Sequence, residues 1–262
     1  MLSVKKQVPA FATALLLLTA SASQAQTSIS FGPRLGANLT TFSYSGNSTG
    51  LDATNYQLGV QVGGTLNLSF GNVAFQPSLL FSQKGAELKG SQQVPFGVST
   101  TNLSATIKPR LNYLELPLNV VYTTGGDHGF QLFAGPYVAV GVGGGGSYKV
   151  SINSDNPDIT TQLPNGEYPG SLSVEYGDRQ NDNSSAGSGN SLGAPTITFT
   201  ARRFDAGLNA GVGYRVGPVQ VQLGYGLGLV NFVPNDSDGN DTGSKAYHRG
   251  FQLAATYFFA AK

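Results

Sequence analysis

The chain has no cysteine and no tryptophan, and only 11% of its 262 residues are charged. Without cysteine it can have no thiol nucleophile, no disulfide, no thiolate-bound zinc and no lipid anchor on an N-terminal cysteine. The charged fraction is less than half of the roughly 25% that is usual in soluble domains. This scarcity of charge argues against a cytosolic enzyme and against a nucleic-acid-binding protein, which would need a basic surface.

Glycine and uncharged polar residues take the place of the missing charge. The sequence contains 36 glycines, 12 tyrosines and 15 phenylalanines, and its apolar fraction is 40%. Because a glycine destabilises a helix interior by about 1 kcal/mol relative to alanine, this composition favours strands and turns over helices. The many aromatic residues argue against disorder.

The first 25 residues have the features of a secretory signal peptide. Lys5 and Lys6 precede an apolar stretch at 10–22, which is shorter than the roughly 20 residues of a membrane-spanning helix. Ser23 and Ala25 then supply the small residues that precede a cleavage site. We therefore expect cleavage after Ala25 and export of residues 26–262.

From residue 29 onward, apolar or aromatic residues alternate with glycine and small polar residues. In the segment 56–70, for example, the even positions are mostly Leu, Val and aromatic, and the odd positions are Gln, Gly, Thr, Asn and Ser. A period of two predicts β-strands with one apolar and one polar face. The pattern predicts eight strands, over 29–39, 56–70, 73–82, 114–122, 130–140, 204–215, 219–229 and 247–259.

The connections between these strands alternate in length. Short turns are expected at 71–72, 125–129 and 217–218, and long loops at 43–55, 90–105, 151–195 and 234–246. Strands of about ten residues cross a bilayer when they are tilted, and an even number of them with short periplasmic turns and long external loops is typical of outer-membrane barrels. We therefore predict an all-β fold, an eight-stranded antiparallel up-and-down transmembrane β-barrel.

Aromatic residues near the strand ends predict two girdles at the membrane surfaces. The girdle beside the short turns comprises Phe31, Phe70, Phe75, Tyr122, Phe130, Tyr214, Tyr257 and Phe259. The girdle beside the long loops comprises Phe42, Tyr56, Phe81, Phe204 and Tyr247.

Five segments of the predicted strands carry a characteristic combination of motifs. They are FGPRLGANLTTF at 31–42, YLELPLNVVY at 113–122, FAGPYV at 133–138, RFDAGLNAGVGYRV at 203–216 and FQLAATYFF at 251–259. This combination resembles the PorT-type family of Bacteroidota outer-membrane β-barrels, over nearly the whole mature chain. The resemblance implies an eight-stranded barrel in the outer membrane, and one branch of that family is associated with protein secretion.

The sequence offers little that can catalyse a reaction. Its two histidines, His128 in a predicted periplasmic turn and His248 at the external end of the last strand, are expected to lie a membrane apart. A barrel enzyme would need His248 together with a loop serine and an acid such as Asp236, Asp238 or Asp241. We expect instead that His248 is a solvated residue at the edge of a loop, and we predict no catalytic residue.

No cofactor or metal site is predicted either. The run DSDGND at 236–241 begins like a calcium loop but lacks the Gly at position six and the Glu at position twelve of an EF-hand. The glycines at 143–146 and 211–228 lack the Gly-Lys-Ser/Thr of a phosphate loop. We expect those glycines to give a narrow barrel room to coil.

Four charged residues occupy inward-facing positions of the predicted strands: Arg34, Glu115, Asp205 and Arg215. Because an unpaired buried charge costs several kcal/mol, we expect the two cations and two anions to neutralise one another. An eight-stranded barrel has room only for its own side chains. The hypothesis is therefore a salt-bridged lumen without a conducting pore.

The sequence thus predicts a noncatalytic integral outer-membrane protein with an envelope-structural or surface-binding role, or a component of a larger envelope or secretion machine. The expected partners are outer-membrane lipid, the barrel-insertion machinery during biogenesis, and an envelope protein or extracellular ligand at the external loops.

In the long loop, Leu172, Val174 and Tyr176 alternate and predict a hairpin extension above the membrane. Two alternatives stay open: an outer-membrane enzyme with its site near His248, and a soluble exported lipocalin-like barrel whose apolar parity would face inward.

Overall fold

The computed structural model describes residues 27–46, 53–96, 99–162, 164–180 and 196–260, so the predicted signal peptide lies outside the described residues. The elements are β1 (Thr27–Gly46), β2 (Ala53–Phe70), β3 (Val73–Phe96), β4 (Ser99–Gly125), β5 (His128–Ser154), α2 (Pro157–Gln162), β6 (Gly166–Tyr176), β7 (Ile197–Ala201), β8 (Phe204–Val216), β9 (Val219–Gly228), β10 (Ser244–Tyr257) and β11 (Phe259–Ala260). In the described part of the chain, no helix is long and apolar enough to cross a membrane.

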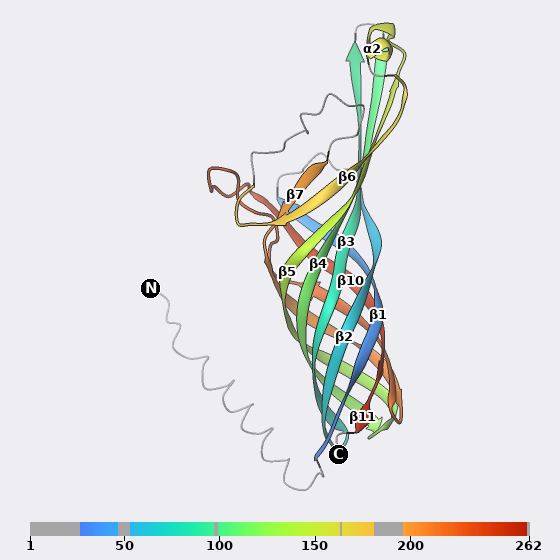
Figure 1. Ribbon diagram of the computed structural model, residues 1–262, viewed down its shortest axis with the longest axis vertical. Coiled ribbons are helices and arrows are strands. Elements are labelled where there is room, and N and C mark those ends of the chain that lie inside the picture. The colour runs from blue at the N-terminus through green and yellow to red at the C-terminus, as the bar shows by residue number, and fades with distance from the viewer. Residues whose placement is uncertain (1–26, 47–52, 97–98, 163, 181–195, 261–262) are drawn as a thin grey trace.

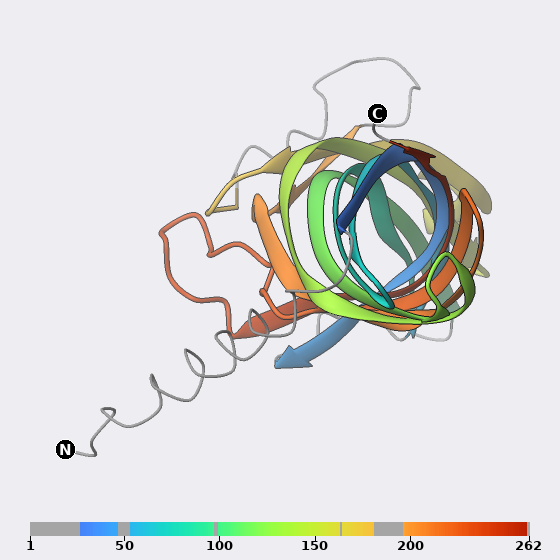
Figure 2. The same cartoon turned by 90° about the horizontal axis from the view of Figure 1, so that it is seen from below.

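Eight of these strands close into an antiparallel barrel (Figure 1). Neighbours pair in the order β4-β3-β2-β1-β10-β9-β8-β5, and the pairing of β4 with β5 completes the ring. Leu35 of β1, for example, lies between Val62 of β2 and Ala255 of β10. The view along the axis shows the closed ring (Figure 2). The predicted eight-stranded up-and-down barrel is confirmed.

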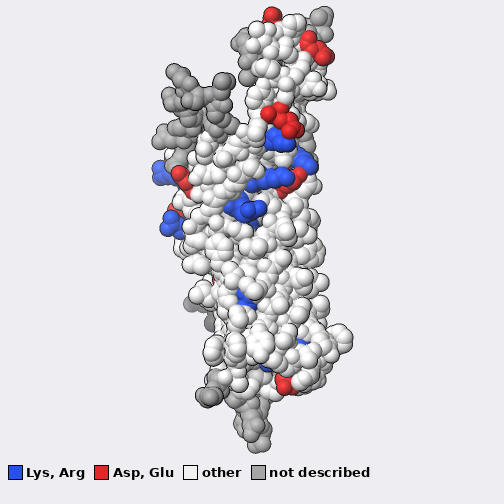
Figure 3. All heavy atoms as spheres, turned by 45° about the vertical axis from the view of Figure 1, so that its right-hand side comes forward, with Lys and Arg blue, Asp and Glu red and all other residues white. Residues whose placement is uncertain are grey.

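The barrel is apolar on its outside and polar on its inside. Leu58 and Leu79 are 64% and 62% exposed on the outer surface, whereas Gln61 and Gln76 are buried in the lumen. On the face shown in Figure 3, the lower part of the outer surface is almost free of charged residues. A lipocalin-like soluble barrel would have the opposite arrangement, so that alternative is wrong.

The periplasmic turns are as tight as predicted. Three glycines adopt the left-handed conformation at these turns, Gly71, Gly126 and Gly217, with φ of 66°, 71° and 55°. Residues with a Cβ rarely adopt this conformation, which explains the glycine at each turn. Each turn joins two neighbouring barrel strands, namely β2 to β3, β4 to β5 and β8 to β9.

Three strands continue far beyond the barrel at its external end. β3, β4 and β5 have 24, 27 and 27 residues. The predicted loop 90–105 is therefore wrong, because β3 runs to Phe96 and β4 begins at Ser99, and the two strands stay paired up to these residues. Backbone hydrogen bonds between paired strands form with any type of side chain. A hairpin with water on both faces therefore needs no alternation of apolar and polar residues, and its sequence pattern does not predict strands.

The predicted long loop 151–195 also contains regular structure. It holds the end of β5, α2 and β6, whereas residues 181–195 lie outside the described residues. β6 pairs antiparallel with β5, which confirms the hairpin extension predicted from Leu172, Val174 and Tyr176. β7 pairs with β6 in parallel. We call β6, β7 and the parts of β3, β4 and β5 above Lys84, Leu111 and Gly144 the external sheet.

Most residues of the predicted girdles have exposed side chains on the outer surface, but Phe42 does not. Phe31 and Phe130 are 55% and 71% exposed near the periplasmic end, and Phe204 is 68% exposed near the external end. Phe42 is only 3% exposed. Its position in β1 has the same parity as the inward-facing Arg34, so its ring lies inside.

Candidate functional site: the lumen and the external cleft

Near the periplasmic end, amide side chains fill the lumen. Gln76 and Gln220 donate to each other, with N···O distances of 2.9 and 3.1 Å, and Gln131 donates to Gln220 at 3.1 Å. Gln76 also donates to Asn67 at 2.9 Å. An amide both donates and accepts, so inward amides from different strands satisfy one another without introducing charge.

The four predicted lumen residues all face the interior, but the structure does not join them in one network. Arg34 donates to Gln222 Oε1 at 2.8 Å. Arg215 lies near the periplasmic end, donates from Nε to the Gly217 carbonyl at 3.0 Å and stands over the Phe258 ring. Among the described residues, neither guanidinium forms an ion pair with Glu115 or Asp205.

The cation that pairs with both Glu115 and Asp205 is Lys84, from β3. Its Nζ lies 2.8 Å from Glu115 Oε2 and 3.0 Å from Asp205 Oδ2. The same Nζ lies 4.2 Å from the centre of the Tyr137 ring, whose hydroxyl donates to Asp205 Oδ2 at 3.1 Å. All three charged side chains are at most 6% exposed. We call Lys84, Glu115 and Asp205 the lumen ion cluster.

Sequence reasoning missed Lys84. The predicted strand 73–82 ended two residues too early, which left Lys84 outside any strand. If the strand is continued by two residues, Lys84 falls on the same inward-facing side as Gln76, Ser78 and Ser82, all of which are buried. That parity was the signal that could have found it.

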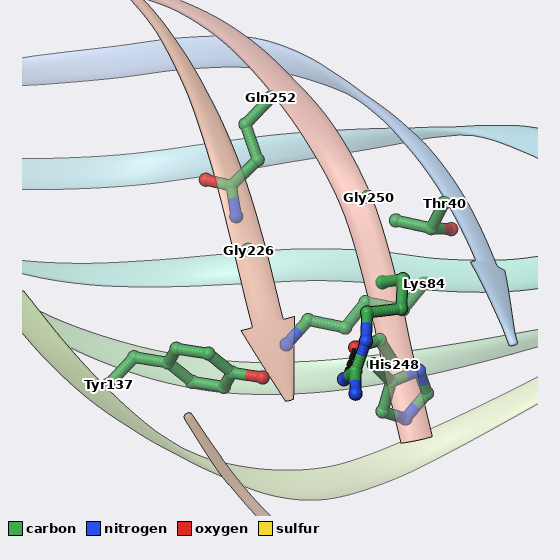
Figure 4. A pocket seen from close by; sticks show the side chains of 8 residues that line it. Thr40, Lys84, Tyr137, Gly226, His248, Gly250 and Gln252 are labelled. Carbon is green, nitrogen blue, oxygen red and sulfur yellow. Dashed lines mark hydrogen bonds between the residues drawn. The ribbon is translucent and has the colours of Figure 1, made fainter. Parts of the chain in front are cut away.

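A small cavity lies beside the lumen ion cluster. It measures about 10 Å³ and is lined by Thr40, Lys84, Tyr137, Gly226, His248, Arg249, Gly250 and Gln252. Figure 4 shows the Lys84 ammonium reaching toward the Tyr137 hydroxyl in this region. A cavity needs about 10–15 Å³ to hold one water, so this one has no room for an organic substrate.

Inward-facing glycines make room for aromatic rings in the lumen. A Cβ on Gly207 would lie 2.7 Å from Tyr137 Cε1, and a Cβ on Gly211 would lie 2.7 Å from Phe133 Cζ. Both distances are shorter than any carbon–carbon contact allows. The glycines of β8 therefore serve the packing of the lumen.

His248 is not the solvated loop-edge residue that the sequence suggested. It is 2% exposed, stacks on Phe232 with ring centres 4.6 Å apart, and contacts Phe42 edge-on. Its Nε2 lies 3.1 Å from the Tyr113 hydroxyl. Position 248 lies opposite Phe42 and on the inward parity of β10, so the ring enters the lumen rather than the loop. Within the described residues, its hydrogen bonds include no acid and no serine.

The acidic run 236–241 folds as a local turn. Asp236 accepts from the Asn240 amide at 2.7 Å, and Asp241 accepts from the Gly243 amide at 2.9 Å. Within the described ranges, no three His, Cys, Asp or Glu residues are grouped to hold a metal ion. At the periplasmic end, His128 Nδ1 lies 2.9 Å from Asp127 Oδ1, and this hydrogen bond lowers the pKa of Asp127.

Above the lumen ion cluster, an apolar core closes the external end of the barrel. Its members come from the barrel wall, from the external sheet and, in the case of Phe232, from the segment between β9 and β10. Each is at most 7% exposed, and they include Phe42, Leu88, Leu111, Tyr113, Tyr137, Val174 and Phe232. Packed aromatic and aliphatic side chains therefore lie between the lumen ion cluster and the external sheet.

An apolar cleft lies in the external sheet above this core. It measures about 130 Å³ and is lined by Ala105, Ile107, Tyr148, Lys149, Val150, Leu172, Ile197, Thr198 and Phe199. We call it the external cleft. β7 forms one side of it and is the last strand of the sheet, so within the described residues its outer edge pairs with no other strand. Such an edge presents backbone N–H and C=O groups that can pair with another chain.

The chain is similar to a protein family and to several solved structures. The family model of the outer membrane protein beta-barrel domain matches residues 24–233, which is most of the chain. Among solved structures, the attachment invasion locus protein Ail of Yersinia pestis is similar, at 9% identity and a TM-score of 0.33, with 88% of this chain and 99% of that chain covered. Neisserial surface protein A is similar at 9% identity and a TM-score of 0.34, with 89% and 99% covered. A search of curated proteins finds no match.

The family match and the apolar outer surface of the barrel both indicate where in the cell the protein lies. A closed barrel with an apolar outer surface satisfies every backbone polar group inside the bilayer. The protein resides in the outer membrane and contacts its lipid. The chain belongs to the outer membrane protein β-barrel domain family.

Proposed function

We propose that this protein is a noncatalytic surface-binding protein whose external cleft holds part of a partner molecule. The observation that carries the proposal is the external cleft itself, in which apolar side chains of four strands surround about 130 Å³ above the membrane. A concave, mostly apolar site with a few polar groups is the usual form of a binding site. The cavity beside Lys84 in the lumen is much smaller, at about 10 Å³.

The partner is an envelope protein or an extracellular molecule. The free edge of β7 adjoins the cleft, so an extended segment of a protein partner can add to the sheet while its side chains enter the cleft. The PorT-type resemblance belongs to this proposal as well. Its motifs lie on barrel strands, so they support a barrel like that of the PorT-type family. The identity of the partner decides whether the chain works in a secretion machine.

Site-directed photo-cross-linking in intact cells tests the cleft. A photoreactive residue in place of Thr198, which lines the cleft, is expected to give an adduct of defined mass. Filling the cleft with Ala105→Trp is expected to abolish that adduct. A photoreactive residue in place of Asp127, in the periplasmic turn, is the matched control and is expected to give no adduct of that mass. An adduct that persists in Ala105→Trp, while the barrel still migrates as folded in unheated gels, would contradict the proposal.

The proposal includes a lumen that does not conduct ions. The amide side chains, the lumen ion cluster and the apolar core occupy successive levels of the lumen. In planar bilayers the purified protein is expected to produce no discrete openings. Large, stable channels would show that the lumen is open and would remove this part of the proposal.

The proposal also includes export by residues 1–25, insertion of residues 26–262 by the barrel-insertion machinery, and the absence of any catalytic residue. The mass of the protein isolated from outer membranes is expected to correspond to a chain that begins at Gln26. Retention of residues 1–25 in the isolated protein would contradict cleavage after Ala25.

A further inference from the structure

Four cations lie together on the outer surface, just above the apolar band of the barrel. They are Lys89 of β3, Lys108 and Arg110 of β4 and Lys149 of β5, and we call them the basic patch. Lys89 and Lys149 each lie opposite Thr106, two residues from Lys108. Figure 3 shows Lys and Arg side chains in the upper half of the molecule, with Asp and Glu side chains beside them, above a surface that is nearly uncharged on the face shown.

The height of the basic patch relative to the membrane follows from the outward-facing residues of β4. The outward-facing side chains from Tyr122 up to Leu114 are apolar, and Arg110 is the first outward-facing charge above them. At a rise of about 3.3 Å per residue and a tilt of about 40°, the ten residues from Tyr122 to Asn112 span about 25 Å, which is the height of the apolar band of outer-membrane barrels. Arg110 therefore lies at the level of the external lipid headgroups.

The carboxylates in contact with the basic patch leave it with an excess of positive charge. Lys89 and Lys108 share Glu87, each at 2.7 Å, and Lys149 lies 2.7 Å from Glu167. The side chain of Arg110 forms no hydrogen bond or ion pair with any residue that the structure describes. Its neighbours on the adjacent strands are Gly85 and Gly145, which have no side chain to pair with it.

The opposite end of the barrel lacks such a patch. The turn between β4 and β5 carries Asp127 and His128, which bond to each other. Arg34 and Arg215 are buried in the lumen, and the described periplasmic turns expose no lysine or arginine. Within the described residues, the basic patch therefore has no counterpart at the periplasmic end.

We propose that the basic patch binds the phosphate groups of anionic lipids in the external leaflet. The planar guanidinium of Arg110 can form two parallel hydrogen bonds to one phosphate, and the lysines act as point charges beside it. The paired strands hold these side chains at headgroup level before any lipid arrives. Lys108 and Arg110 lie on the face of β4 opposite to Ile107, which lines the external cleft. Lys149 belongs to both the basic patch and the lining of the cleft, so the two surfaces meet at this residue.

The absence of tryptophan from the chain makes a direct measurement possible. A single reporter, Leu114→Trp, lies two positions below Asn112 on the outward face. In vesicles that contain phosphatidylcholine and phosphatidylglycerol, quenching by a brominated form of each lipid gives their relative association constant at the reporter. Because one basic residue near an anionic membrane contributes about 1 kcal/mol, we expect a preference of about five-fold for the anionic lipid.

Three comparisons sharpen this experiment. The reporter Tyr122→Trp, on the same face at the periplasmic end, is expected to show no preference. Lys108→Gln with Arg110→Gln is expected to reduce the preference at Leu114→Trp to about one-fold, whereas Lys245→Gln on the distant strand β10 leaves it unchanged. Salt at 1 M, where the Debye length is about 3 Å, is expected to remove the preference without any change to the patch.

Two outcomes would overturn the proposal. Equal quenching by the two lipids at Leu114→Trp, with the patch intact, would assign the patch to a soluble acidic partner instead. A preference that survives both the double substitution and 1 M salt would show that the patch does not cause it. Neither outcome depends on the external cleft, because the vesicles contain no partner protein.

Discussion

The two halves of β4 have opposite polarity. In the barrel, its outward residues are Leu114, Leu116, Leu118, Val120 and Tyr122. In the external sheet its outward residues include Lys108 and Arg110, while Leu111 and Tyr113, at the upper end of the barrel, face inward and are fully buried. The alternation of the strand continues, but the apolar side chains change faces. Lipid surrounds the lower half and water the upper half, so the change of face marks the external boundary of the membrane.

β3 changes face at the same height. Leu79 is exposed on the outer surface and Gln76 is buried in the lumen, whereas higher up Glu87 and Lys89 face outward and Leu88 is buried. The two regions are therefore stabilised differently. The external sheet buries an apolar core away from water, as a soluble protein does, while the barrel depends on lipid outside and on hydrogen-bonded polar groups inside.

The largest effect is expected from removing the cation inside the barrel. Lys84→Met leaves Glu115 and Asp205 buried without a counter-charge, and breaking a buried ion pair costs about 3–5 kcal/mol. We expect the urea midpoint of unfolding in detergent or lipid, followed by loss of the folded band in unheated gels, to fall accordingly.

A neutral lumen provides the control for this prediction. The triple variant Lys84→Met, Glu115→Gln and Asp205→Asn removes all three charges and is expected to recover most of the stability. If Lys84→Met is as stable as the unaltered protein, the lumen ion cluster does not stabilise the barrel. The polar interior of the barrel would then not contribute to stability in the way proposed.

A charge on the outer surface is expected to distinguish the two regions of β4 directly. Leu116 lies near the middle of the apolar band and Thr106 lies on the same face above the boundary. Leu116→Arg is expected to destabilise the protein in vesicles by about 2–4 kcal/mol, the cost of an arginine at the bilayer midplane. Thr106→Arg is expected to change stability by less than about 0.5 kcal/mol. If the two substitutions change the free energy of unfolding equally in urea titrations, the external boundary of the membrane does not lie between Leu116 and Thr106.

The barrel was predictable from the sequence because lipid imposes an apolar residue at nearly every second position of each spanning strand. The strand predicted at 204–215 matches β8, Phe204–Val216. Above the membrane this constraint ends, and segment 90–105 has Ser, Gln and Thr at both parities. A wet hairpin and a solvated loop then have the same residue pattern, although only the hairpin has a backbone ladder.

The contents of the lumen were predictable only in part. Parity places Glu115 and Asp205 inside, but it cannot say which side chains meet across the lumen, and Lys84 reaches an acid 121 residues away. The positions of His248 and Phe42 were mistaken for a different reason. Both lie near strand ends and were assigned by that closeness, whereas the parity of their strands places them inside.

The smallest effect is expected at the exposed ion pairs of the external sheet. Hydrogen bonds from Lys108 and Lys89 lower the pKa of Glu87 below its usual 4.5. Because the pKa is lower in the folded state than in the unfolded state, the pairing stabilises the β3–β4 hairpin above the usual pKa, and this stabilisation is lost as the pH falls through the lowered pKa. Amide exchange in residues 90–94, corrected for its intrinsic pH dependence, is expected to show a slight loss of protection below about pH 4.5. In Glu87→Gln this part of the pH dependence is expected to vanish, and an unchanged profile in that variant would show that the exposed pairs contribute nothing to the external sheet.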